Sequence, residues 1–160
     1  MCAQLDARRL VTTELYVVPP TYHQIAVSVG VHAQPGYSGN AVCTWVEKVL
    51  RQYLSPMPPY GPAGGGWPLG RQVFGPELMA AALQVEGIDY LDPIQLGELD
   101  DNGDWQVVDP SQPITLQPWE VVQLSSITVV PGPPLPPGQP VPAPPPPSAL
   151  LPIPVPKDQC

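Results

Sequence analysis

Proline is concentrated at one end of this chain, which limits the part that can fold. Residues 131–160 hold 14 of the 27 prolines and only two charged residues, Lys157 and Asp158. Each proline fixes φ and removes a backbone donor, so such a segment cannot form a helix or the core of a sheet. We therefore expect 131–160 to be an extended, polyproline-like and disordered tail. Residues 1–130 remain for one domain, which is long enough to bury a core.

The net charge of −8 is spread unevenly. Residues 1–71 carry five basic and three acidic residues, whereas residues 72–130 carry ten acidic residues and no basic one. Nucleic acid is therefore not an expected partner, because phosphate binding requires a basic patch. The acidic region predicts a solvated acidic face. Alternatively, the acidic region of one molecule contacts the mildly basic first region of a copy or partner, head to tail.

The three cysteines, Cys2, Cys43 and Cys160, are widely spaced and odd in number. This pattern argues against a disulfide framework or a zinc site and fits a reducing compartment. The N-terminus has no apolar stretch of signal-peptide length, and no run reaches the roughly 18–20 apolar residues of a membrane span. We expect a soluble chain.

Hydrophobic periodicity indicates an α+β domain. Leu10–Val18 is predicted to be a strand, and Gln24–His32 is the clearest strand, with an apolar face and a small or polar face that meets solvent or a close neighbour. A helix from Ser38 to Leu54 follows, with Trp45 on its apolar face. The further predicted elements are a short strand at 72–74, a helix opening at Gly75-Pro76, a strand over 88–99 kinked at Pro93, a hairpin turn at 101–104, and strands at 105–108, 114–116 and 119–130. This order predicts a mixed or antiparallel sheet with two helices on one face.

No catalytic or metal-binding constellation can be identified from spacing. His23 and His32 fall on opposite faces of one strand, so they cannot share a metal through it. Glu98, Asp100, Asn102, Gly103 and Asp109 match a calcium-loop template imperfectly, and an acidic Asn-Gly hairpin is the preferred interpretation. We predict neither an enzyme nor a cofactor nor a metal site.

A long loop is predicted over residues 55–70, and its later part, 61–71, contains the most distinctive sequence, Gly64-Gly65-Gly66-Trp67-Pro68-Leu69-Gly70-Arg71. Its glycines permit positive φ and close approach to another surface. Trp67 either anchors a neighbouring subunit or folds back on its own core, and Arg71 is a candidate charge partner for an acidic neighbour. The predicted interface residues are Trp67, Pro68, Leu69 and Arg71 with Tyr53 and Tyr60, and Asp101 and Asp104 in the acidic hairpin 98–109.

Several segments together resemble one known family. They are residues 8–20 with Tyr22, Gln24–His32, the helix through Leu54-Ser55-Pro56, Gly66–Val73 and Val85–Tyr90. The chain is similar over roughly residues 8–99 to the C-terminal domain of baseplate assembly proteins, the J-like or wedge proteins of contractile injection systems and contractile phage tails. The Trp-Pro-Leu-Gly-Arg loop is the most specific part of this resemblance.

The resemblance implies a structural role without catalysis or cofactor. Proteins of this family form wedges arranged with approximate six-fold symmetry around the central hub and spike, and they connect to the sheath. The implied partners are other wedge, hub, spike and sheath subunits, and assembly is expected in the cytoplasm, with release of the particle left open. The alternative is an adaptor whose proline-rich tail recruits a partner with a polyproline-binding groove.

Overall fold

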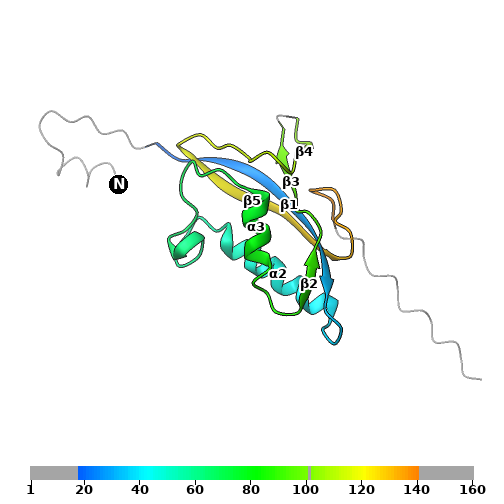
Figure 1. Cartoon of the computed structure of the whole chain (residues 1–160). Coiled ribbons are helices and arrows are strands. Elements are labelled where there is room, and N and C mark those ends of the chain that lie inside the picture. The colour runs from blue at the N-terminus through cyan, green and yellow to red at the C-terminus, as the bar shows by residue number, and fades with distance from the viewer. Residues whose placement is uncertain (1–17, 101, 141–160) are drawn as a thin grey trace, which may run out of the picture.

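The computed structural model describes residues 18–100 and 102–140 (Figure 1). The element order is β1 (Thr21–Ala33), α2 (Gly39–Tyr53), the 3-10 turn η1 (Pro62–Gly64), α3 (Gly75–Ala82), β2 (Ile88–Leu91), β3 (Gln95–Leu99), β4 (Trp105–Val108) and β5 (Glu120–Pro131). The α+β class predicted from the sequence is confirmed. Of the predicted strand Leu10–Val18, all but Val18 lies outside the described residues.

β1 is the centre of a mixed five-stranded sheet. β5 runs parallel to it and pairs along Thr21–Val31. The opposite edge of β1 therefore carries both β3, which pairs antiparallel over Ile25–Ser28, and β2, which pairs antiparallel over Val31–Ala33. β4 then pairs antiparallel with β3. The strand expected over 88–99 is thus two short strands along one edge, separated where Pro93 lacks a backbone donor.

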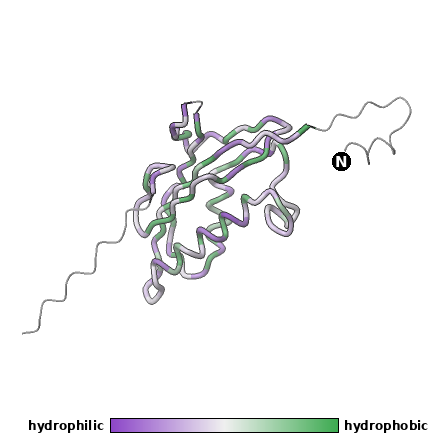
Figure 2. Tube along the Cα trace, turned by 180° about the vertical axis from the view of Figure 1, so that it is seen from behind, coloured by the Kyte–Doolittle hydropathy of each residue, from purple (hydrophilic) through white to green (hydrophobic). Residues whose placement is uncertain are grey.

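One hydrophobic core lies between the sheet and the two helices. Alternate side chains of β1 meet Val42, Val46 and Leu50 of α2, and Leu78 and Ala82 of α3 belong to the same cluster. Hydrophobic positions recur at intervals along α2 and are separated by hydrophilic ones, as expected for a helix with one buried face (Figure 2).

Trp45 departs from the predicted pattern. It was expected on the buried face of the helix, but its side chain is 56% exposed. The sheet covers only the stripe formed by Val42, Val46 and Leu50, which are all buried. Trp45 lies beside that stripe on the helix surface, so its large side chain remains exposed.

The second face of β1 is also buried, because the chain returns across it. Ala26 and Ser28 are fully buried, and a Cβ added at Gly30 would lie 2.1 Å from the carbonyl oxygen of Gly132. We call residues 132–140 the strap; Figure 1 shows this segment on the side of the sheet away from α2. The hydroxyl of Thr128 donates to the carbonyl of Gln139 (2.9 Å) and fastens the strap to β5.

The strap changes one expectation about the proline-rich region. Pro131 ends β5, and Pro137 is buried beside Gly97 of β3 instead of lying in a free tail. Proline has no backbone N–H to leave unpaired, so an extended proline-rich segment can lie against a sheet face without strand pairing. The rest of the predicted tail, residues 141–160, lies outside the described residues.

Substituting Gly30 tests the strap. Gly30→Ala should lower the free energy of unfolding by about 1–3 kcal/mol, because the added Cβ collides with the backbone of Gly132 and Pro134. Gly39→Ala is the matched control, since its Cβ would meet nothing closer than 3.8 Å and alanine favours the helix. Urea unfolding of both variants provides the measurement. Equal stability of the two variants would contradict close packing of the strap on β1.

Candidate functional site

The glycine-rich loop is folded tightly onto the end of α2. The amide of Gly66 donates to the carbonyl of Tyr60 (2.7 Å), and that of Trp67 donates to Ser55 (2.8 Å). Gly66 has a φ of 82°, and a Cβ there would lie 2.3 Å from the carbonyl oxygen of Pro56. The predicted need for close approach therefore holds at Gly66, whereas a Cβ at Gly65 would meet nothing within 4 Å.

Trp67 packs into its own domain. Its side chain is 4% exposed and belongs to the core cluster. The ring makes an edge-to-face contact with Tyr53, with centroids 5.9 Å apart, and the indole N–H donates to the carbonyl of Arg71 (3.2 Å). Of the two roles that the sequence left open for Trp67, the structure supports the one in which it folds back on the core.

Arg71 is also engaged within the domain. Its guanidinium lies 5.0 Å from the centroid of the Trp67 ring and forms an ion pair with Glu77 of α3. The hydroxyl of Tyr53 donates to the same carboxylate oxygen (2.7 Å). Burial, and then this hydrogen bond to Glu77, raise the pKa of Tyr53. Arg71, Glu77 and Tyr53 thus join the loop to both helices.

Three of the predicted interface residues, Tyr60, Pro68 and Leu69, form the outward surface of the loop. Leu69 is 61% exposed and Tyr60 is 45% exposed, while Pro68 is also at the surface. A rigid loop therefore presents an apolar tip to solvent.

Replacement of Trp67 tests whether its side chain stabilises the fold of its own domain or is needed only for contact with a neighbouring subunit. Trp67→Ala should cost about 3–5 kcal/mol of folding free energy, because it removes a buried aromatic side chain. Leu69→Ala, at an exposed position in the same loop, should stay within about 0.5 kcal/mol of the parent. Chemical denaturation of both variants measures the difference. A Trp67→Ala protein as stable as the parent would show that the indole does not support the core.

The acidic hairpin forms as predicted between β3 and β4. One carboxylate oxygen of Asp100 accepts from the amides of Asn102 (2.9 Å) and Asp104 (2.8 Å), and Gly103 takes a φ of 88°. The backbone hydrogen bond from Asp104 is the main cause that lowers the pKa of Asp100. Asp104 is exposed, whereas Asp101 lies outside the described residues.

The Asp100 turn has a predictable pH dependence. Its pKa is lower in the folded chain than in the unfolded chain, so its contribution to stability is present above the unfolded pKa and is lost as pH falls through the folded pKa. In an NMR titration the Asp100 carboxyl should have its midpoint below the ordinary value of 3.8. A midpoint at or above that value would mean that the turn amides do not hold the carboxylate.

The two histidines contact separate carboxylates. His23 Nε2 lies 3.0 Å from Glu98 and His32 Nε2 lies 3.0 Å from Asp92, while the His32 ring stacks on Tyr90. Glu98, the first position of the imperfect calcium template, is thus turned toward His23. Within residues 18–100 and 102–140, no three His, Cys, Asp or Glu side chains are grouped as metal ligands would be.

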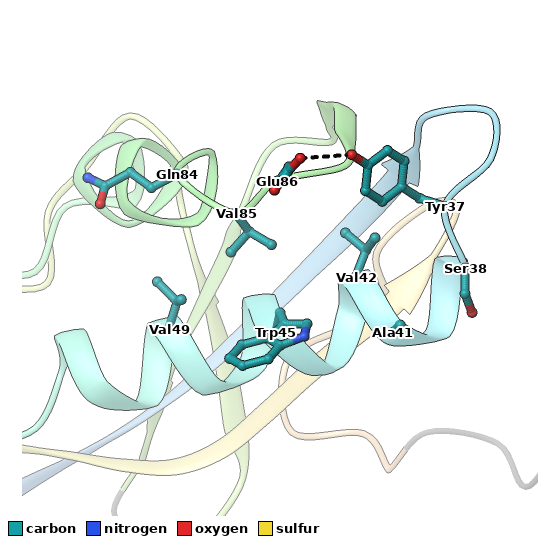
Figure 3. Close-up of a pocket in the computed structure, with 9 residues that line it drawn as sticks. All are labelled: Tyr37, Ser38, Ala41, Val42, Trp45, Val49, Gln84, Val85 and Glu86. Atoms are coloured by element: carbon teal, nitrogen blue, oxygen red, sulfur yellow. Dashed lines mark hydrogen bonds between the residues drawn. The ribbon is translucent and has the colours of Figure 1, made fainter.

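A surface groove was not foreseen from the sequence. It has a volume of about 530 Å³ and lies between α2 and the connection from α3 to β2 (Figure 3). We call it the α2 groove; its lining residues are Tyr37, Ser38, Ala41, Val42, Trp45, Val49, Gln84, Val85 and Glu86. The sequence feature that could have indicated this groove is the wide apolar stripe of α2, because a sheet cannot cover all of it and Trp45 and Val49 line the groove.

The two sides of the α2 groove are joined at one end. The hydroxyl of Tyr37 donates to the Glu86 carboxylate (2.9 Å), and the Tyr37 ring covers Gly87 so closely that a Cβ there would lie 2.4 Å from it. The hydrogen bond to Glu86 is the main cause that raises the pKa of Tyr37. Trp45 and Val49 form one wall, and Val85 stands opposite them (Figure 3).

Comparisons with known proteins add no relative: no protein-family model matches the chain, and no curated protein matches it. Across the described part of the chain, none of the helices has the length and apolar character needed to span a membrane.

Proposed function

We propose that this chain is a structural, non-enzymatic wedge component of the baseplate of a phage-tail-like contractile injection particle, acting in assembly and in the connection between baseplate and sheath. The observation that carries the proposal is the Trp-Pro-Leu-Gly-Arg loop. This loop is the most specific point of resemblance to baseplate assembly proteins, and it is an internally braced element with an exposed apolar tip. A rigid tip suits repeated contacts with neighbouring subunits, because little conformational entropy is lost on binding.

The roles of the loop residues divide under this proposal. Trp67 and Arg71 hold the loop in shape, and Pro68 and Leu69 contact another baseplate subunit. The acidic side chains of residues 72–130, which have no basic residue among them, provide charge complementarity toward basic partners. Wedge, hub or sheath subunits are the proposed partners, in an assembly of approximate six-fold symmetry.

Particle assembly tests the proposal directly. Particles from a strain that lacks this gene should have defective baseplates or detached sheaths in electron micrographs. Intact baseplates with normal sheaths would overturn the function.

A pair of matched substitutions tests the loop itself. Leu69→Glu places a charge on the exposed tip and should prevent incorporation of the chain into particles, while its thermal stability stays near that of the parent. Leu83→Glu, at a position 50% exposed after α3, is the control and should be incorporated normally. Immunoblots of purified particles report incorporation. Normal incorporation of the Leu69→Glu chain would exclude the tip as the contact.

A further inference from the structure

The α2 groove has the chemistry of a site for an extended proline-rich segment. Trp45 is 56% exposed and Tyr37 is 46% exposed, and both line an open, mainly apolar groove. Polyproline helices dock in aromatic grooves of this kind, because their fixed backbone loses little entropy on binding. Trp45 is exposed, and its indole N–H can donate to a carbonyl of a docked segment.

The charge at the groove favours a basic residue at one end of the occupant. Glu86 lies at the Tyr37 end and accepts the Tyr37 hydroxyl, which leaves its second carboxylate oxygen for another donor. Lys48 Nζ lies 4.8 Å from the centroid of the Trp45 ring, but Lys48 is not among the residues that line the groove. An apolar, proline-rich segment with one lysine therefore matches the groove.

The chain itself contains such a segment. Residues 150–157 read Leu-Leu-Pro-Ile-Pro-Val-Pro-Lys, in which prolines alternate with aliphatic residues. Lys157 is the only basic residue after Arg71. We propose that residues 150–157 dock in the α2 groove of the same molecule, with the prolines against Trp45 and Tyr37 and Lys157 beside Glu86.

The connecting length is sufficient for this contact. Pro131 lies next to Gly39 at the start of α2, and the strap then ends beside Thr128 of β5. One sheet and one helix layer together are about 20 Å thick. Residues 141–149 span about 28 Å in polyproline conformation, at roughly 3.1 Å per residue. This length exceeds the combined thickness of the two layers, so it permits the contact.

The proposal does not depend on a baseplate role, and a spin label tests it on the full chain. Cys2→Ser leaves Cys160 as the reactive thiol, because Cys43 is buried and burial raises the pKa of its thiol. A nitroxide on Cys160 should broaden the NMR signals of the Trp45 indole and the Tyr37 and Val49 amides. The Leu69 amide, on the distant loop, should keep its intensity.

Variants and mixing make the result decisive. Trp45→Ala should abolish the broadening at Val49, and replacing Pro152, Pro154 and Pro156 by alanine should do the same while the domain signals stay in place. Absence of broadening at the groove in the parent chain would overturn the proposal. A mixing experiment combines an isotope-labelled copy that carries no nitroxide with a nitroxide-carrying copy that has no isotope label. Broadening of the first copy's signals in this mixture would overturn the proposal, because the docked segment would then come from a neighbouring molecule.

Discussion

The burial of β1 on both faces is the constraint on which the rest of the structure depends. Its aliphatic side chains pack against α2 and α3, and its opposite face carries Ala26, Ser28 and Gly30, which are too small to exclude water alone. The strap covers that face with backbone and proline rings. Ser28 Oγ is left buried without a hydrogen-bond partner among the described residues, at a cost of about 1–3 kcal/mol. The strap is held there by close packing together with hydrogen bonds such as the one from Thr128 to the carbonyl of Gln139.

The same constraint explains why the loop that contains Trp67 and Arg71 packs against its own domain and links the two helices. The helices must cover the front face of the sheet, and the chain has to pass from the end of α2 to the start of α3 at the margin of the core. Trp67 fills that margin. Its indole N–H is paired with the carbonyl of Arg71, and the Arg71 guanidinium is paired with Glu77, so these polar groups have partners at the edge of the core. Within the loop, the large apolar side chains that stay exposed to partners are Met57, Tyr60 and Leu69.

Periodicity could predict the elements but not what covers them. The alternation in Gln24–His32 and the spacing of Val42, Val46 and Leu50 specify a strand and a helix, since each pattern has only one matching period. The strap could not be predicted, because proline-rich segments lack periodicity and their packing depends on glycines distant in sequence. Trp45 was misplaced for a related reason: helical spacing gives the direction of a side chain but not the width of the surface that meets it.

The candidate surfaces differ in how much of them the sequence could reveal. The loop was identified by unusual residue types in one short stretch, and the structure then assigned Trp67 and Leu69 to different roles. The α2 groove arises from segments some 40 residues apart, Tyr37–Val49 and Gln84–Glu86, which are brought together by the pairing of β2 with β1. Gly87 permits that approach, because any side chain there would collide with the Tyr37 ring. A site of this kind becomes visible only when the register of the sheet is known.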